Sequence, residues 1–561
     1  MRWNYPQAGP GNVALTGALP TRAVLALGFG SSPSAAATLA ISALFQPFEL
    51  IWQQQISHWR EWHGNCQMPA LHSTAKALPK DIAAQVKTSA MVLRTHHDLI
   101  FRGALVASLS IPWGETAEER PGYHLVWPRN LVECAGALLA LGSEVEAREV
   151  LRYLMATQRE DGSWFQNQWL GGKSYWTGNQ LDQVAFPVLL AGTLADRNAL
   201  DGIAVNDMVQ RALTFIACNG PSSPQDRWEE DSGVNTFTLA VCIAALVSGS
   251  RFLDNANKTF SLQLADYWNA RLEDWTAVFA TEFAAKHGVA GYYLRIMPTA
   301  ALGDDFVLSR IMPIKNRDSD PALSAVEQIG VDFLQLVRYG LPQGPGWYRY
   351  NGDGYGEHDD GRPFDGTGRG RPWPLFCGER GHYELLAGGD ALSLLQTMAA
   401  MSGTGGMLPE QVWDASPIPA RDLYPGRPTG SAMPLAWAHA EFIKLACSIL
   451  EGRPVDRPAP LWARYHGQRA KADVWFWTPQ APLYVIPAGV QPAVCLTRPA
   501  TIRWRYDNQD VQTLSTEPLS SGMYPARLPV VPAAAQQLKL ELIAADGQTV
   551  AAQVRIKQPE N

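Results

Sequence analysis

Three stretches of the sequence place carboxylates beside tryptophan rings. Glu229 and Glu230 directly follow Trp228 in "QDRWEEDSG", Glu410 lies in "GGMLPEQVWD", and Trp373 lies in "GRPWPLFCGERGHYEL". A single loop carboxylate is usually solvated or interacts with a helix dipole. Two well-separated loop glutamates among many tryptophans are more informative. Glycoside hydrolysis needs such a pair, because one protonated carboxyl donates to the leaving oxygen and one ionised carboxylate acts on the other face.

The third stretch also carries Glu379 and Glu384. These two are rival candidates for the chemistry, but we expect both to be structural. Glu384 is expected to enter a helix, and Glu379 is expected to pair with an arginine.

The stretch "VWPRN", residues 126–130, precedes the apolar run "LVECAGALLALG". Proline is tolerated in the first turn of a helix and asparagine is a good N-cap, so the pattern predicts a loop that enters a helix. Two interpretations of the polar residues stay open. Asn130 could cap the helix, or Trp127, Arg129 and Asn130 could form a floor for a flat polar ligand such as a sugar.

Helix-period segments follow one another from about residue 33 to 451, and several of them are apolar nearly all round. Such helices must be covered on more than one side. The pattern therefore predicts two layers, with inner helices covered by outer ones. Long loops rich in Gly, Trp, Asp and Arg, such as 158–178 and 343–381, separate the helices, and loops of this length usually carry function.

The two ends of the chain differ from this helical region. Residues 1–31 alternate apolar and polar positions between Gly and Pro breaks, which predicts two short strands, too few to fold alone. A helical linker region is expected over 32–80 and a helical domain over 81–455. After the Pro-rich "RPVDRPAPLW", residues 456–561 show short alternating runs that predict a small β-sandwich.

Composition limits the class of partner. The chain has 561 residues, a net charge of -7 and a pI near 5.9, so nucleic acid is not expected as the main partner and a neutral substrate fits better. Twenty Trp residues exceed the needs of a core and can supply flat faces for ligands. The seven cysteines include no CxxC pair, which predicts buried thiols and neither a disulfide framework nor a zinc site. No cofactor or metal site is indicated.

The sequence holds no run of eighteen uninterrupted apolar residues, so no membrane span is expected. The start "MRWNYPQAGPGNVALTG" lacks a basic segment followed by an apolar one. For the chain as written this predicts a cytoplasmic location. If the true N-terminus lay upstream of Met1, a periplasmic or secreted location would also be compatible with the sequence. Nothing in the sequence indicates the oligomeric state.

Six ordered motifs resemble glycoside hydrolase family 15, in its bacterial glucoamylase and glucodextranase branch. They are "GYHLVWPRNLVE", "DGSWFQNQWLGGKSYWTGNQLDQVAFPVLLA", "DRWEEDSGVNTFTLA", "GWYRYNGDGYGE", "GRGRPWPLFCGERGHYELLAG" and "MLPEQVWD". The resemblance implies an (α/α)6 barrel, with a remnant of an N-terminal β-sandwich before it and a small β domain after it. It also implies an exo-acting hydrolase that releases glucose from the non-reducing ends of α-glucans with inversion.

The same resemblance implies roles for eleven residues. Glu229 matches the general acid and Glu410 the general base, whose carboxyl groups are then expected about 6.5 to 9.5 Å apart. The residues that match sugar-binding positions are Trp127, Arg129, Asn130, Trp176, Trp228, Glu230, Arg349, Trp373 and Trp437.

The chain departs from the family pattern at two polar positions. Relatives read "WPRD" where this chain has "WPRN", and "QLDE" where it has "QLDQ", so Asn130 and Gln183 replace carboxylates. Two hypotheses follow. The chain is an active α-glucosidase, which the presence of Glu229 and Glu410 favours, or it is an impaired relative that binds α-glucosides with little turnover. The preferred linkage, α-1,4, α-1,6 or that of trehalose, stays open.

Overall fold

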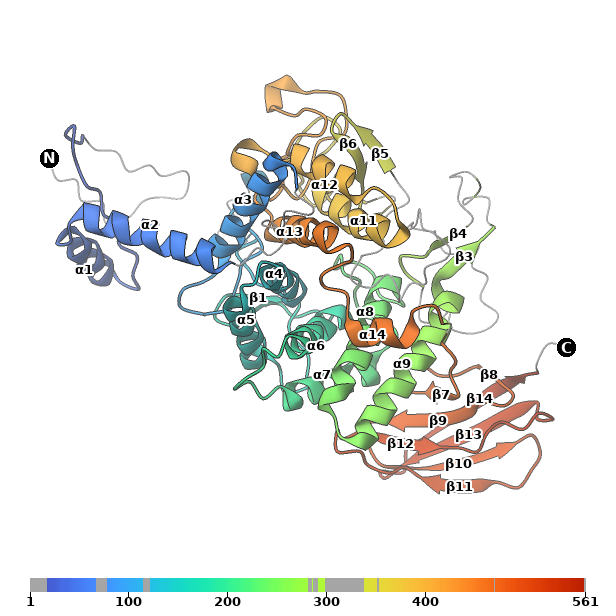
Figure 1. Cartoon of the computed structure of the whole chain (residues 1–561). Coiled ribbons are helices and arrows are strands. Elements are labelled where there is room, and N and C mark those ends of the chain that lie inside the picture. Colours follow the sequence, from blue (N-terminus) through green and yellow to red (C-terminus); the bar gives the residue numbers. More distant parts are fainter. Residues whose placement is uncertain are drawn as a thin grey trace. The chain divides into compact units, whose positions relative to one another are not determined.

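The computed structural model describes residues 18–66, 78–114, 122–280, 285, 291–297, 338–350, 353–468 and 470–558. The chain divides into two compact units, Met1–Gln67 and Met68–Asn561 (Figure 1). The helix expected in "SAVEQIGVDFLQLVRYG" lies almost entirely outside the described residues.

The first unit contains helices α1 (Pro33–Leu44) and α2 (Phe48–Asn65). The Ser32 side chain caps α1 by accepting from the backbone N–H of Ala35, and Pro47 precedes α2 as its N-cap after a sharp bend. In the described part of the chain no single helix is long and apolar enough to cross a membrane. The α1–α2 pair passes that test together but is bent by 95°.

The two strands predicted in residues 1–31 are not found over 18–31, and residues 1–17 lie outside the described part. The segment packs against α1 and does not pair with another strand. A Cβ atom at Gly28 would lie 1.9 Å from the carbonyl oxygen of Ala36, so only glycine permits this approach. The apolar side chains of this segment are exposed, with Leu25 at 71% and Phe29 at 84%, so their alternation did not mark a covered face. The domain boundaries predicted from the sequence stay predictions.

The second unit begins with two concentric layers of helices. The inner helices are α4 (Pro128–Ala140), α6 (Leu181–Asp196), α8 (Thr236–Gly249), α11 (Pro374–Ala387) and α13 (Ala436–Glu451). The outer helices are α3 (Lys80–His96), α5 (Glu144–Thr157), α7 (Asn206–Asn219), α9 (Asn255–Thr276) and α12 (Ala391–Ala400). Each outer helix packs on one or two inner helices, and α11, α13, α4, α6 and α8 contact one another in that order. The predicted two-layer arrangement is confirmed.

Burial explains the two layers. Every residue of α8 is buried, as its uniformly apolar sequence requires, whereas α5 and α7 bury one face only. The inner helices share a direction, so the loops before them meet at one end of the barrel.

Short hairpins in these loops are β1 (Asn167–Gln168) with β2 (Ser174–Trp176), β3 (Ala277–Phe279) with β4 (Gly291–Tyr293), and β5 (Arg338–Leu341) with β6 (Gly344–Trp347).

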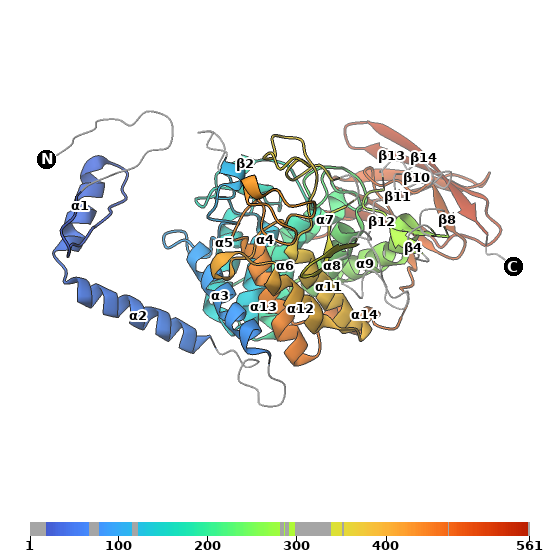
Figure 2. The same cartoon turned by 90° about the horizontal axis from the view of Figure 1, so that it is seen from above.

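The C-terminal part of the second unit holds α14 (Ala459–Tyr465) and two sheets. One sheet has the order β11-β10-β13-β14-β8 and the other β12-β9-β7. The strands lie beside α9 (Figure 2), where the rings of Phe476 and Phe260 have centroids 5.2 Å apart. The strands are β7 (Val474–Trp477), β8 (Val485–Pro487), β9 (Gln491–Leu496), β10 (Ala500–Tyr506), β11 (Gln512–Ser515), β12 (Tyr524–Arg527), β13 (Gln537–Ala544) and β14 (Thr549–Lys557).

Candidate active site

A large cavity opens where the N-terminal ends of the inner helices meet. Its empty volume is about 2220 Å³, open solvent included. All eleven residues singled out in the sequence line it, although they are spread over 311 positions of the chain. They are Trp127, Arg129, Asn130, Trp176, Trp228, Glu229, Glu230, Arg349, Trp373, Glu410 and Trp437.

The loop that carries Glu229 is organised by a buried carboxylate, Asp226. One oxygen of Asp226 accepts from the backbone N–H groups of Trp228 at 3.2 Å and Glu230 at 3.1 Å, and the other accepts from Arg295 Nε at 2.7 Å. These bonds hold a tight turn in which Glu229 has a left-handed backbone, φ 69°. The sequence analysis missed Asp226, although an Asp at the start of a short loop is typical of an Asx turn.

Glu229 lies between aromatic and amide donors. Trp127 Nε1 donates to Glu229 Oε1 at 2.6 Å, and the Gln166 side chain bonds to the same carboxyl group. Burial raises the pKa of Glu229 above its ordinary value, and the positive charges of Arg129 and Arg349 together with these hydrogen bonds oppose part of that rise. A raised pKa favours the protonated carboxyl that a general acid needs.

Glu410 is held by two tyrosines. Tyr123 Oη donates to Glu410 Oε1 at 2.7 Å, Tyr355 Oη donates to Oε2 at 3.4 Å, and the two phenol oxygens are 2.5 Å apart. Burial raises the pKa of Glu410 to about 7, while the Tyr123 bond and the charge of Arg349 act in the opposite direction. The sequence analysis missed both tyrosines, since a loop tyrosine next to a motif usually only packs.

Asn130 does not cap its helix. The N-cap of α4 is Trp127, which makes no side-chain cap bond, and Pro128 is the first helical residue. The capping interpretation is therefore wrong, because Pro128 fixes the start of the helix two residues before Asn130. The Asn130 side chain lines the cavity, and its Oδ1 atom is buried without a hydrogen-bond partner.

The Arg129 guanidinium is held in place by hydrogen bonds within the protein. Its Nη1 donates to Asp182 Oδ2 at 2.7 Å and to Gln180 Oε1 at 3.0 Å, and its Nη2 donates to the backbone oxygen of Arg227 at 2.9 Å. Gln183 belongs to the same network. Its amide donates to the backbone oxygen of Gln166 at 2.9 Å and to Gln180 Oε1 at 2.7 Å. A carboxylate at position 183 could make neither donation.

Glu230 belongs to a cluster of opposite charges at the cavity wall. Arg349 Nη2 donates to its Oε1 at 3.0 Å, and Arg295 Nη2 donates to its Oε2 at 2.6 Å, with Tyr350 Oη as a third donor. Arg349 also forms two bonds with Asp353, at 2.8 and 2.6 Å. This pairing fixes the Arg349 guanidinium at the cavity wall. Arg295 was missed in the sequence, because it lies far from the motifs it supports.

Three tryptophans form one aromatic wall. The ring centroid of Trp228 lies 5.5 Å from that of Trp373 and 6.3 Å from that of Trp437. Trp176 stands at the rim, 47% exposed. Indole faces of this kind pack on the apolar faces of sugar rings.

A second aromatic cluster on the cavity was not predicted. Trp113, Tyr355 and Phe364 have ring centroids 5.0 to 5.4 Å apart. All three line the cavity. The Tyr355 ring lies 6.5 Å from that of Trp373, so this cluster continues the tryptophan wall.

The rival carboxylates lie in α11 and are structural. Glu379 forms two 3.2 Å bonds with Arg227, as predicted, and both side chains are buried. Glu384 accepts from Arg380 Nε at 2.7 Å. It lies in the second half of α11, so the prediction that it enters a helix was wrong. Pro374 marks the entry instead.

The comparisons with known proteins agree with this geometry. A family model described as glycosyl hydrolases family 15 matches residues 83–447, and one described as glucodextranase, domain N, matches residues 1–64. A glucoamylase from Clostridium sp. (strain G0005) is 33% identical over 469 residues, which are 79% of this chain and 62% of that protein.

A crystal structure of a bacterial glucoamylase complexed with acarbose matches with a TM-score of 0.64 and 30% identity. The match covers 78% of this chain and 64% of that one, so the chain spans less than two thirds of the length of either relative. The match confirms the (α/α)6 barrel fold. The chain belongs to glycosyl hydrolase family 15.

Proposed function

We propose that the chain is an exo-acting α-glucoside hydrolase that releases glucose from the non-reducing ends of α-glucans or oligosaccharides, with inversion at the anomeric carbon. The observation that carries the proposal is the pair Glu229 and Glu410 in one cavity. Each carboxyl group accepts hydrogen bonds from neutral donors, and burial raises the pKa of both. Family membership supports the same reaction class.

In the proposed mechanism Glu229 protonates the glycosidic oxygen as that bond breaks. Glu410 removes a proton from a water molecule that attacks the anomeric carbon from the opposite face. Tyr123 and Tyr355 orient the Glu410 carboxylate, and Trp127 orients Glu229. Arg129, Asn130, Glu230 and Arg349 line the cavity as hydroxyl partners for the terminal sugar.

The alternative is an impaired relative that binds α-glucosides with little turnover. Asn130 and Gln183, which replace carboxylates of the family pattern, favour it. Gln183 makes two donations within the protein and so serves the structure. Asn130 is the departure that bears on the substrate, because it lines the cavity and its Oδ1 has no hydrogen-bond partner within the protein.

Glucose release from maltose, isomaltose and trehalose separates the two hypotheses and assigns the linkage. The proposed enzyme releases glucose from at least one of them, and proton NMR of the fresh product shows β-glucose. Acarbose, the ligand in the related glucoamylase, is expected to inhibit competitively. Acarbose binding without measurable glucose release would support the impaired relative.

The roles of the two glutamates are tested with α-glucosyl fluoride, whose leaving group needs little acid assistance. Glu229→Gln is expected to lose activity on glucosides but keep much of it on the fluoride, whereas Glu410→Gln loses both. Glu384→Gln is the matched control, because Glu384 is a partly buried glutamate paired with Arg380 outside the cavity. Equal loss on both substrates in Glu229→Gln would overturn its assignment as the acid.

A further inference from the structure

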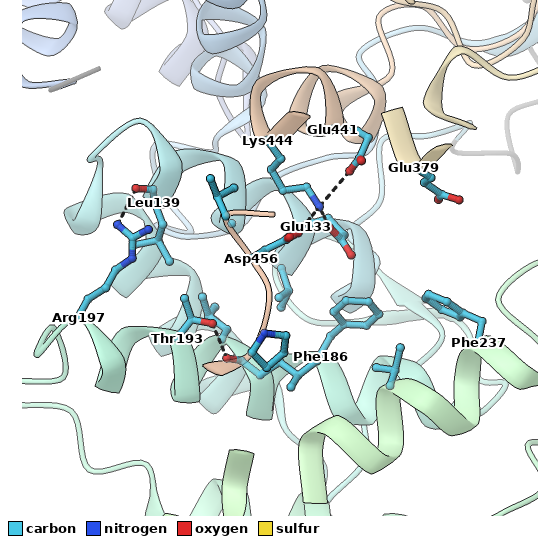
Figure 3. A pocket seen from close by; sticks show the side chains of 17 residues that line it. Glu133, Leu139, Phe186, Thr193, Arg197, Phe237, Glu379, Glu441, Lys444 and Asp456 are labelled. Atoms are coloured by element: carbon cyan, nitrogen blue, oxygen red, sulfur yellow. Dashed lines mark hydrogen bonds and ion pairs between the residues drawn. The ribbon is translucent and has the colours of Figure 1, made fainter. Parts of the chain in front are cut away.

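Glu357 is a buried carboxylate without a cation partner. In a smaller cavity among the inner helices, by contrast, the carboxylates of Glu133, Glu441 and Asp456 all pair with Lys444 (Figure 3). Glu357 is 4% exposed, and within the described part of the chain no Lys, Arg or His side chain forms an ion pair with it. Burying a carboxylate without a cation costs stability, so such a group is a candidate for a functional role.

Neutral donors hold the Glu357 carboxyl group instead. The backbone N–H of Gly430 donates to Glu357 Oε1 at 2.6 Å. Burial raises the pKa of Glu357, and the Gly430 bond, the charges of Arg371 and Arg421 and the Trp113 indole N–H oppose part of that rise. The Arg371 guanidinium donates to the backbone oxygen of Glu357 and not to its carboxyl group.

Gly430 brings Glu357 and Trp113 together. Its carbonyl oxygen accepts from the backbone N–H of Trp113 at 2.6 Å. A Cβ atom at position 430 would lie 2.8 Å from Trp113 Cδ1 and 3.0 Å from Glu357 Oε1, so a side chain there would displace both groups. Glu357 Oε2 and Trp113 Nε1 are both buried without a hydrogen bond of good geometry. One is an acceptor and the other a donor, so each is the natural partner of the other.

Trp113 has an uncommon backbone conformation. Its φ of 54° and ψ of 12° lie in the left-handed region, where a residue with a Cβ atom is strained. Such strain is common where a side chain is directed at a ligand. The Trp113 ring lines the cavity beside Phe364 and Tyr355, with centroid distances of 5.3 and 5.4 Å.

Exposure changes along the upper cavity, as we call the one that holds the two catalytic candidates. The rings of Trp127, Trp373 and Trp437 are 4 to 5% exposed, whereas Trp113 is half-buried and Trp176 at the rim is 47% exposed. An exo-acting enzyme takes the terminal sugar at the closed end of its cavity. The next sugar of the chain then lies nearer to the opening, at the depth of Trp113.

We propose that Glu357 is a positioning residue that orients the Trp113 indole against the second sugar of the substrate, the one that leaves. The inference rests on the proposed function and deepens it on the leaving-group side. Trp113 makes the contact, because its flat ring can pack on the apolar face of a sugar. Glu357 is not among the residues that line the cavity, so it acts through Trp113 and does not touch the substrate. The pair would then set the preference for substrates that have a second sugar ring.

The test compares the binding of two inhibitors to the full chain by calorimetry. Acarbose has several sugar-like rings, and deoxynojirimycin has a single glucose-like ring. Glu357→Gln keeps the size of the side chain but offers one acceptor in place of two and sets an NH2 donor against the indole N–H. We expect it to weaken acarbose binding about fivefold or more and to leave deoxynojirimycin binding within about twofold of the parent. An equal loss for both ligands, or no loss for either, would overturn the role of Glu357.

A double-mutant cycle tests whether the effect runs through Trp113. Trp113→Phe keeps a ring but removes the indole N–H, so in that background Glu357→Gln should change acarbose binding by less than about twofold. A loss as large as in the parent background would show that Glu357 acts by another route and would refute the proposal.

Glu146→Gln is the matched control. Glu146 is 8% exposed, accepts from Ser143 Oγ at 2.6 Å and is not among the residues that line the upper cavity. This variant should bind both inhibitors as the parent does, and a selective loss of acarbose binding there would refute a specific role for Glu357. If the parent bound neither inhibitor, the proposed function would fail as well, whereas parent-like binding by Glu357→Gln would refute the positioning role alone.

Discussion

Replacing Asn130 by aspartate should raise activity on ordinary α-glucosides. Asn130 is the third residue of α4, lines the upper cavity and has a buried Oδ1 without a partner. Aspartate keeps the size of the side chain and offers two charged acceptors in place of one neutral acceptor. A negative charge in the first turn of a helix is also favourable, by about 0.3 to 1 kcal/mol. The variant should therefore fold as well as the parent.

The magnitude follows from the hydrogen bonds that a sugar would make. A bond to a charged group contributes about 1.5 to 3 kcal/mol, against about 0.5 to 1.5 kcal/mol for a neutral pair. One improved hydroxyl contact is then worth about 1 kcal/mol and two about 2 kcal/mol. Since about 1.4 kcal/mol is a factor of ten, kcat/KM on the best substrate should rise about tenfold or more.

Gln183→Glu is the matched comparison, since it restores the other carboxylate of the family pattern. Here the expected result is opposite. The two donations from Gln183, at 2.9 and 2.7 Å, would be lost, and the new oxygen would face the Gln180 Oε1 acceptor. We expect a loss of about 1 to 3 kcal/mol in unfolding free energy and no gain in activity.

The assay is the initial rate of glucose release from maltose, isomaltose and trehalose, with urea unfolding as the check on folding. If Asn130→Asp is folded and its kcat/KM is unchanged or lower on every substrate, the reasoning is refuted. Asn130 would then be matched to a different sugar.

Three further predictions concern the supporting residues. Because burial raises the pKa of Glu410 to about 7, kcat/KM should fall as pH drops through that value, and Tyr123→Phe should move this acidic limb to higher pH in a pH–rate profile. The pKa of Glu410 is higher in the folded than in the unfolded chain, so its contribution to stability is fully present below about pH 4.5 and is lost as pH rises through 7. Glu410→Gln does not ionise, and at pH 8 its free energy of unfolding in urea should therefore exceed that of the parent by a few kcal/mol. Arg295→Ala should lower the free energy of unfolding by about 3 to 5 kcal/mol, because it leaves the Asp226 carboxylate buried without its cation.

The sequence predicted the helical layers well, because the physical signal is local. A segment such as "TFTLAVCIAALV" is apolar on all sides and has to be covered on all sides, as α8 is. The resemblance to family 15 singled out Glu229 and Glu410, and the fold brings both to one cavity; their roles as acid and base stay predictions. In residues 18–31 the same kind of pattern failed, because alternating apolar residues predicted strands but their side chains are exposed.

The residues that hold the site in shape could not be predicted, because their partners are remote in the chain. Arg295 lies 69 residues from Asp226, and Tyr123 lies 287 residues from Glu410. Only the closed barrel brings these pairs together.

Glu229 adopts a left-handed backbone conformation although it carries a Cβ atom. For a residue with a Cβ atom that conformation costs about 1 to 2 kcal/mol, and glycine would relieve it. Selection for folding alone would thus favour glycine at position 229, and drift after a loss of activity would run in the same direction. The carboxyl group at position 229 thus comes at a cost to the stability of the fold, as is common for backbone strain at functional sites.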